Sequence, residues 1–233
     1  ATNGQFNLGS QPFLKVDRNG ERIANESANY DAIPFASAQH PGGVWCQVFD
    51  VNAPDDVQKF QTQGCSAMTW KMQLKDKTVD EAYDEKYLSK GLMMKADTLD
   101  ELAGLLGYSG DAAKTFVESI EHYNDLCASA DGDTDYGKDK AYMVPIDTPP
   151  FYGGKAELSH TAAPMMVTMS GLVTDETQNV LRQADWTPIK GLYAAGNCLG
   201  GRYGFGYSTP FAGNSIGMAM THGWLAGKTV AHL

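Results

Sequence analysis

Apolar and polar positions in the first fifty residues predict short strands joined by tight turns. Residues 12–16 (PFLKV) lie just before Asn19-Gly20, and an apolar run followed by an Asn-Gly pair indicates a hairpin. Residues 44–51 (VWCQVFDV) are rich in β-branched and aromatic side chains, which favours a buried strand. We therefore expect a small sheet in this part of the chain.

Capping residues and apolar spacing predict two helices further along. Thr98 and Glu101 form a capping box at the start of the first helix, and Gly107 is expected just past its end. Ser109 or Asp111 is expected to cap the second helix. The apolar residues of the second helix recur at helical spacing and are expected to face a core: Ala112, Phe116, Ile120, Tyr123 and Cys127.

The last forty residues predict a strand, a glycine-rich loop and a helix. Residues 191–195 are mostly apolar and are expected to form a strand buried on both faces, which ends at Gly196. The helix is expected to begin within residues 212–215 and to run to Gly227 or beyond. Free N–H groups at a helix start favour negative charge, so this loop and helix form a candidate ligand site.

Charge and glycine are distributed unevenly. Residues 1–150 contain 13 Lys and Arg against 24 Asp and Glu, a net charge of −11, whereas residues 151–233 contain 5 against 4, a net charge of +1. The composition changes at Pro149-Pro150, and prolines favour a boundary because they hold the chain extended. We therefore predict two domains, residues 1–150 and residues 151–233.

The overall net charge of −10 argues against nucleic acid or an acidic membrane surface as a partner, because both require clustered Lys and Arg. No run of about 18–20 apolar residues is present, so no transmembrane helix is predicted. The four cysteines lack Cys-x-x-Cys spacing, which excludes a zinc knuckle. Asp131, Asp133 and Asp135 lack the glycine and the final Glu of a calcium loop, so we expect a solvated turn there and no metal site.

Several separated motifs resemble one flavoprotein superfamily. Residues 191–197 (GLYAAGN), Gly200-Gly201 and residues 212–217 (AGNSIG) resemble the C-terminal FAD segment of the fumarate reductases and ketosteroid dehydrogenases. Residues 19–26 (NGERIANE) resemble the start of the capping domain of that family, and residues 169–175 (MSGLVTD) resemble its return to the FAD domain. The motifs occur in family order and span nearly the whole chain.

The resemblance implies an α+β chain in two parts. Residues 1–150 would form the capping domain, with a small mixed sheet and helices on the substrate side. Residues 151–233 would supply the C-terminal strands and helix of a split Rossmann-like FAD-binding domain. This sequence lacks the G-x-G-x-x-G turn that holds the ADP half of FAD. The chain is therefore expected to be the C-terminal part of a longer flavoprotein, and to be inactive and largely free of FAD by itself.

FAD is the cofactor that the resemblance implies. The N–H groups at the start of the C-terminal helix would face the N1/C2=O edge of the flavin, where negative charge develops on reduction. The residues expected to line the isoalloxazine are Gly196, Asn197, Gly213, Asn214, Ser215 and Ile216.

The substrate residues of the fumarate reductases are replaced here. Tyr30 stands where the family has an arginine acid, and the substrate histidine and the carboxylate-clamping arginine are absent from their matching positions. Because bidentate Arg suits a dicarboxylate, these changes argue against fumarate as the substrate. Tyr30 and Tyr207 are the candidate proton donors, with ordinary packing as the alternative for each. The candidate substrate-binding residues are His160, Arg202, Tyr203, Ser208 and Thr209.

The predicted function is that of an FAD-dependent oxidoreductase, which moves a hydride between flavin and a C=C bond conjugated to a carbonyl or carboxylate. A ketosteroid-type dehydrogenase working in the reverse direction is one alternative, and a non-catalytic, cap-like binding module is another. The expected partners are an unsaturated small molecule, the N-terminal FAD-binding portion and an electron-donor protein. The compartment is left open between the bacterial cytoplasm and export or membrane association through an N-terminal region.

Overall fold

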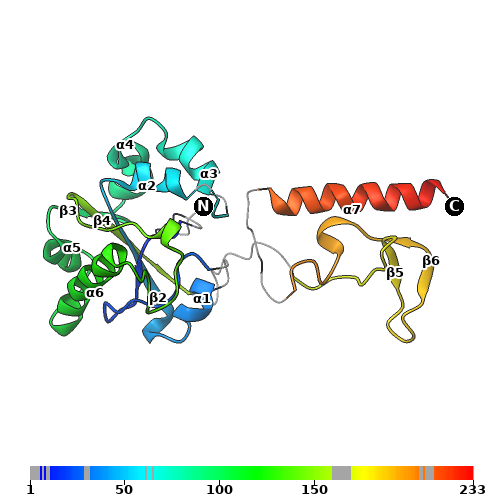
Figure 1. The fold of residues 1–233 in the computed structure, drawn as a ribbon, viewed down its shortest axis with the longest axis horizontal. Coiled ribbons are helices and arrows are strands. Elements are labelled where there is room, and N and C mark those ends of the chain that lie inside the picture. The colour runs from blue at the N-terminus through cyan, green and yellow to red at the C-terminus, as the bar shows by residue number, and fades with distance from the viewer. Residues whose placement is uncertain are drawn as a thin grey trace. The chain divides into compact units, whose positions relative to one another are not determined.

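The computed structural model describes residues 6, 8, 11–28, 32–60, 62–64, 66–158, 169–204, 207 and 213–232. The chain divides into two compact units, residues 1–163 and residues 164–233 (Figure 1). The elements of the first unit are β1 (Lys15–Val16), α1 (Ala32–Ser37), η1 (Pro41–Gly43), β2 (Val44–Asp50), α2 (Ala53–Lys59), α3 (Ser66–Thr69), the π-helical η2 (Trp70–Leu74), α4 (Val79–Tyr83), the π-helical η3 (Asp84–Leu88), β3 (Met94–Ala96), α5 (Leu99–Leu105), α6 (Asp111–Ala128), η4 (Lys140–Tyr142) and β4 (Phe151–Glu157). Those of the second unit are β5 (Asn179–Leu181), β6 (Pro188–Tyr193), η5 (Gly196–Cys198) and α7 (Asn214–Ala231).

A four-stranded sheet in the order β1-β2-β4-β3 organises the first unit. The longest pairing joins β2 to β4, from Val44 opposite Glu157 to Asp50 opposite Phe151. We expected a mixed sheet, and that expectation is wrong for the described strands, whose pairings are all antiparallel. The reason is that β4 lies between β2 and β3 and runs against both. Because β4 begins at Phe151, the first unit extends past the sequence-based boundary at residue 150.

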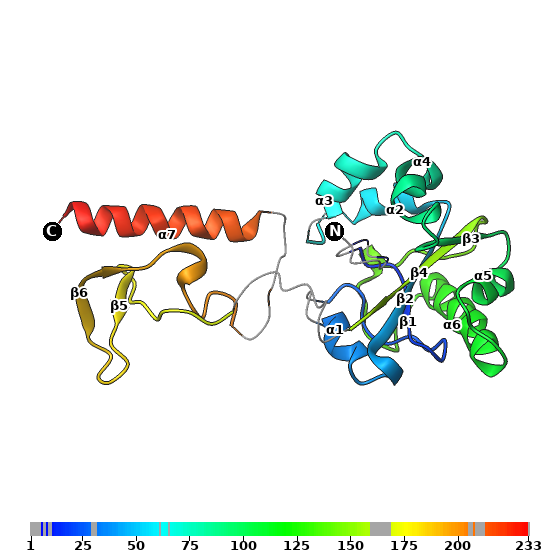
Figure 2. The same cartoon turned by 180° about the vertical axis from the view of Figure 1, so that it is seen from behind.

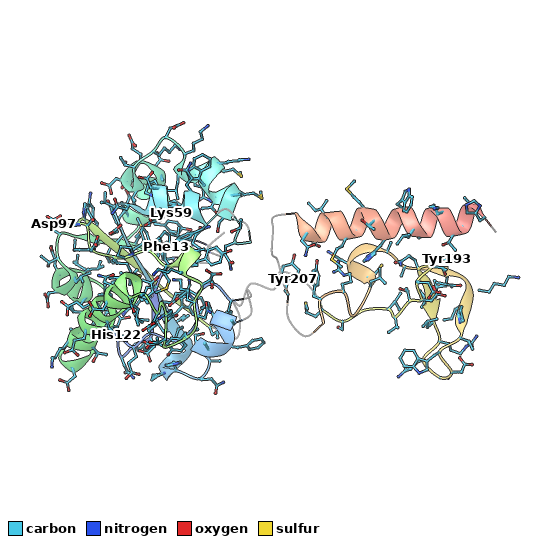
Figure 3. All side chains as sticks on the ribbon, viewed as in Figure 1. Phe13, Lys59, Asp97, His122, Tyr193 and Tyr207 are labelled. Carbon is cyan, nitrogen blue, oxygen red and sulfur yellow. The ribbon has the colours of Figure 1, made fainter. Side chains whose placement is uncertain are left out.

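Helices cover both faces of this sheet, as the two views in Figures 1 and 2 show. One face carries Phe13, Phe49 and Tyr152, which pack with buried residues of α2, η2, α4 and η3. Phe13 is labelled in Figure 3. The other face carries Cys46 and Val48, which pack against buried residues of α5 and α6. The alternation of side chains along a strand thus places an apolar core on each side of the sheet.

Local sequence signals predict much of this unit correctly. The predicted Asn-Gly turn is present: Val16 of β1 forms an antiparallel bridge with Arg22 across it, and Gly20 has a φ of +84°. Thr98 accepts the N–H of Glu101 at the start of α5 as predicted. The expected cap of α6 by Ser109 or Asp111 is wrong, because Gly110 is the N-cap residue and no side chain caps this helix.

A buried ionic network joins the turn after β1 to the loop after α6. The Arg22 guanidinium donates to both oxygens of Glu26 at 2.9 Å and to both oxygens of Asp133 at 2.8 Å. The Lys138 ammonium lies 3.2 Å from Glu26, and all four side chains are almost completely buried. The solvated turn expected around Asp133 is therefore wrong at that residue, because Arg22 folds back over the loop and neutralises the carboxylate.

The second unit is a small hairpin with one long helix. β5 pairs with β6, and Thr229 of α7 donates to the carbonyl of Thr177 at 3.1 Å. The strand expected to be buried on both faces is instead exposed, with Leu192 at 42% of its accessible surface, because β6 has only β5 beside it among the described strands. Within the described part of the chain, no helix combines the length and apolar character needed to cross a membrane.

Candidate functional site

Three of the predicted cofactor residues meet where β6 ends and α7 begins. Gly196 follows the hairpin with a φ of +69°, and a Cβ at this position would lie 3.3 Å from the Cβ of Ala219. Glycine therefore lets the turn approach α7 closely. Asn197 accepts a hydrogen bond from Ser215 at 3.3 Å, which ties the turn to the first turn of the helix.

The start of α7 is open. Gly213 is the N-cap residue in the left-handed conformation, and no side chain caps the helix. Among the described residues, nothing lies within 4 Å of a Cβ built on Gly213 or on Gly217, and the Ile216 side chain is 68% exposed. An 18-residue helix with such a start presents N–H groups and a partial positive charge to a ligand.

The loop before α7 carries a charged and aromatic cluster. The Arg202 guanidinium lies 5.0 Å from the centre of the Tyr203 ring. The Tyr203 and Tyr207 rings meet edge to face, with centroids 4.6 Å apart. Both terminal nitrogens of Arg202 and the Tyr203 hydroxyl are shielded from solvent, yet they have no hydrogen-bond partner among the described residues. The structure thus brings together three of the predicted site residues and leaves two of them with unmet donors.

His222 of α7 is a further titratable residue of this unit, and the sequence analysis did not select it. Its Nδ1 atom is also buried without a hydrogen-bond partner in the described part of the chain. Desolvation lowers the pKa of His222, and the positive charge of Arg202 lowers this pKa further. The available sequence signal was a single histidine inside a helix otherwise rich in small and apolar residues.

Four predicted site residues lie outside the described residues: Tyr30, His160, Ser208 and Thr209. Their roles remain predictions from the sequence.

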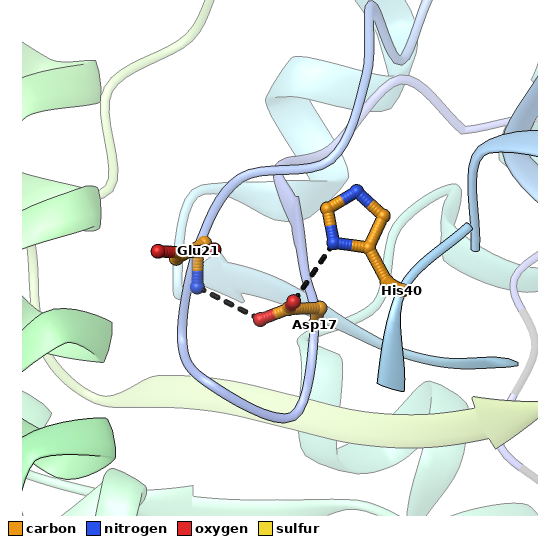
Figure 4. A group of neighbouring side chains, drawn as sticks. All are labelled: Asp17, Glu21 and His40. Atoms are coloured by element: carbon orange, nitrogen blue, oxygen red, sulfur yellow. Dashed lines mark hydrogen bonds and ion pairs between the residues drawn. The ribbon is translucent and has the colours of Figure 1, made fainter. Parts of the chain in front are cut away.

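A second group of polar side chains lies in the first unit (Figure 4). Asp17, Glu21 and His40 each offer an atom that could bind a metal, and these atoms lie within 4.8 Å of one another. One Asp17 oxygen accepts the backbone N–H groups of Asn19 and Glu21, and the other lies 2.9 Å from Nδ1 of His40. Both oxygens are thus already engaged by the chain, and the group closes the turn after β1.

Comparisons with known proteins agree with the family resemblance. A family model described as an FAD binding domain matches residues 8–216. A vinyl phenol reductase from Lactiplantibacillus plantarum is 28% identical over 227 residues, which cover 96% of this chain and 43% of that protein. A 3-oxosteroid 1-dehydrogenase from Mycolicibacterium smegmatis is 36% identical over 160 residues, which cover 63% of this chain and 26% of that protein.

The fold is similar to that of a solved dehydrogenase. The structure of 3-ketosteroid Δ1-dehydrogenase from Sterolibacterium denitrificans matches with a TM-score of 0.64 at 22% identity, over 97% of this chain and 40% of that one. The chain thus spans less than half the length of each of these three proteins. The family match extends over most of the chain and includes the turn and helix start described above. The chain belongs to the FAD binding domain family, and its relatives named above include a vinyl phenol reductase and a 3-oxosteroid 1-dehydrogenase.

Proposed function

We propose that the chain is part of an FAD-dependent oxidoreductase acting on a C=C bond conjugated to a carbonyl or carboxylate. The observation that carries the proposal is the open start of α7 beside Gly196 and Asn197. When bound, FAD supplies hydride exchange at flavin N5. The chain supplies the surface that holds the flavin and the groups that bind substrate and move a proton.

The described residues fit a flavin. The N–H groups of residues 214–216 would hold the electron-rich N1/C2=O edge, and the helix dipole there is worth about 0.3–1 kcal/mol. The space around Gly213 and Gly217 would admit a flat ring system, because no Cβ projects from these positions. This fit favours the negative charge that develops on a reduced flavin.

The proton would be handled by a tyrosine. Tyr207 is buried and packs against the ring of Tyr203, which would fix the position of its hydroxyl. Tyr30 is the second candidate, from its place in the sequence motif. General acid catalysis of this kind is worth about 10²–10⁴-fold in rate.

The two units of the chain would have separate tasks. The first unit, which extends through β4 to residue 163, would act as the capping domain that excludes water from the substrate, and residues 164–233 would be the last segment of the FAD domain. The exposed apolar side chains of α7 support the second assignment, since Ile216, Met220 and Trp224 are 68%, 71% and 61% exposed and follow one another at intervals of four residues. Such a stripe is typical of a helix that packs against further structure. We therefore expect the 233-residue chain alone to hold little FAD and to be inactive.

The test is turnover by the longest protein that the gene encodes, loaded with FAD, on a panel of enones and enoates. Tyr30→Phe or Tyr207→Phe should lower kcat by about 10²–10⁴-fold while the bound flavin is retained. Tyr193→Phe is a matched control in the same unit and should leave kcat unchanged. A stable FAD complex that reduces none of these substrates, and oxidises none of their saturated forms, would refute the proposal.

The direction of the reaction is a separate question. The two sequence relatives named above point in opposite directions, because one is named for reducing a vinyl group and the other for dehydrogenating a 3-oxosteroid. The arginines with which fumarate reductases bind fumarate are absent from the matching positions, and the loop before α7 carries aromatic residues. Both features support a substrate larger and less charged than fumarate. Product analysis with an artificial electron acceptor distinguishes a dehydrogenase from a reductase. A full-length protein that binds no flavin would instead favour the non-catalytic binding module.

A further inference from the structure

We propose that Lys15 makes the attachment of residues 11–13, the segment that leads into β1, sensitive to pH: the neutral amine holds the segment in place, and protonation favours its release. The proposal concerns the first unit and is independent of the flavin site. Only its consequence for catalysis, which is easier motion of the capping domain in mild acid, rests on the proposed function.

Three buried side chains hold the backbone carbonyls of this segment. Lys15 donates from its Nζ atom to the carbonyl of Gln11 at 2.9 Å and to that of Phe13 at 3.2 Å. Lys138 donates to the carbonyl of the residue between them, and Gln47 of β2 donates to that of Gln11 at 3.3 Å. All three donors are almost completely buried. The segment is therefore held in place at the cost of keeping two lysine side chains out of water.

The buried charges around Lys15 do not balance. The described ionic groups of this polar centre are three cations and two carboxylates: Lys15, Arg22, Lys138, Glu26 and Asp133. Arg22 pairs with both carboxylates, and Lys138 lies 3.2 Å from Glu26. Lys15 is the one cation of the centre that forms no ion pair with a described residue. An unpaired buried charge is costly and arginine does not give up its proton, so Lys15 is the group that becomes neutral.

Electrostatics put this titration near neutral pH. Burial lowers the pKa of Lys15 from 10.5 to about 7, whereas the carboxylate of Glu26 raises this pKa and the ammonium of Lys138 lowers it further. Gln47, which lies opposite Lys15 on β2, is uncharged. The other described titratable groups of the centre act on Glu26 or Lys138, or pair with each other: Arg22, Asp133, Tyr123 and Cys127.

The direction of the effect follows from solvation. When the segment opens, Lys15 meets water and its pKa returns toward 10.5, so the open form binds more protons than the closed form above about pH 7. Opening is therefore easiest below about pH 7 and becomes harder as the pH rises. With these two pKa values, the opening constant should be about 20-fold lower at pH 8.5 than at pH 6.5.

Hydrogen exchange of the longest protein that the gene encodes tests the proposal, with or without bound flavin. Mass spectrometry follows the peptides that cover residues 11–17 at pH 6.5 and pH 8.5. Correction for the intrinsic pH dependence of amide exchange leaves the opening constant of this segment. We expect that constant to fall by about 20-fold between the two pH values.

Variants identify the group that titrates. Lys15→Met keeps a side chain of similar length without a proton to lose, so its opening constant should be the same at both pH values within about 2-fold. Lys15→Arg remains charged and should open at pH 8.5 at least as readily as the unsubstituted protein does at pH 6.5. Lys114→Met is the matched control, because Lys114 is an exposed lysine of the same unit, paired with Glu118 of α6. This control should retain the full change with pH.

Three outcomes would overturn the inference. The first is an opening constant that does not change with pH, and the second is one that rises between pH 6.5 and pH 8.5. The third is a change that persists in Lys15→Met, because another group would then be its source. The proposed function fails separately: pH-dependent opening without turnover of any enone or enoate refutes the oxidoreductase and leaves this inference, whereas turnover with pH-independent opening refutes only the inference.

Discussion

The ionic network of the first unit gives a sharp prediction, because it depends on one carboxylate. Asp133 accepts two hydrogen bonds from Arg22 and backbone N–H groups from Asp135, Tyr136 and Lys138. Asp133→Asn keeps the shape of the side chain but turns one acceptor into a donor. We expect this change to loosen the loop from β1 and α6 and to lower the free energy of unfolding.

The magnitude has two parts. Burial alone would raise the pKa of Asp133, but the hydrogen bonds and charge of Arg22 lower it from 3.8 to about 2. That shift corresponds to about 2 kcal/mol. The Asp133 carboxylate has no solvent contact of its own but lies close to the protein surface, where screening reduces this figure to about 1–2 kcal/mol. In the variant, the NH₂ group of the asparagine faces another donor, either Arg22 or the Lys138 N–H. This unsatisfied pair of donors lowers the free energy of unfolding further, by about 1–3 kcal/mol. We therefore expect Asp133→Asn to destabilise the first unit by about 2–5 kcal/mol at pH 7.

The charge contribution depends on pH with a definite sign. The folded pKa of Asp133 is below its unfolded value, so the stabilisation is present above about pH 4 and is lost as pH falls toward 2. At pH 3 the unsubstituted protein has lost about half of the stabilisation that the Asp133 charge provides at pH 7. The asparagine variant lacks this dependence, so the gap between the two proteins should narrow by about 0.5–1 kcal/mol between pH 7 and pH 3.

Hydrogen exchange in increasing urea, read on peptides from β2 and α6, measures the stability of this unit separately from that of the second. Asp135→Asn is the matched control, since Asp135 is in the same loop and the partner of its side chain in the described part of the chain is the exposed His122. The control should cost no more than about 0.5 kcal/mol. Equal losses for the two variants at pH 7, or a gap that does not narrow at pH 3, would refute the reasoning.

Two further predictions concern the same unit and the cysteines. Gly20→Ala should destabilise the first unit by several kcal/mol in urea unfolding, because φ is +84° and the new Cβ would lie 2.4 Å from the backbone nitrogen of Phe116. The control Gly91→Ala should cost only about 1 kcal/mol, because Gly91 has a φ of +64° but no described atom within 4 Å of the new Cβ. Iodoacetamide at pH 8 should modify the exposed Cys198 well before Cys46, since burial raises the pKa of the Cys46 thiol to about 12; mass spectrometry that found Cys46 modified first in the folded protein would contradict this.

Elements with a signal in their own sequence were predicted well. The Asn19-Gly20 turn, the strand from Val44 and the cap at Thr98 each depend on a few neighbouring residues, whose preferences the rest of the fold reinforces. The helical spacing of Phe116, Ile120 and Tyr123 also identified the buried face of α6 correctly.

Features that depend on distant residues could not be predicted in the same way. Asp133 looked like part of a solvated acidic turn, but Arg22, 111 positions away, determines its burial. The insertion of β4 between β2 and β3 is likewise set by long-range pairing. The lowered pKa of His222 likewise depends on its burial and on the charge of Arg202, 20 positions away. The turn at residue 196 and the helix start at residue 214 are local features, so the sequence could predict them, whereas their role in binding flavin stays a prediction.

The two units are stabilised to different degrees. The first has a core on each face of its sheet and a buried ionic network. The described core of the second consists of Val180, Ala194 and Leu199 with Ile189 beside them, and no described residue of α7 is buried. Burial of one large apolar side chain stabilises a fold by about 1.5–3 kcal/mol. The apolar side chains exposed on α7 would therefore stabilise this unit further if other structure covered them. The residues proposed to meet flavin and substrate therefore lie in the unit that depends most on further contacts, and binding of cofactor and folding of this unit should be coupled.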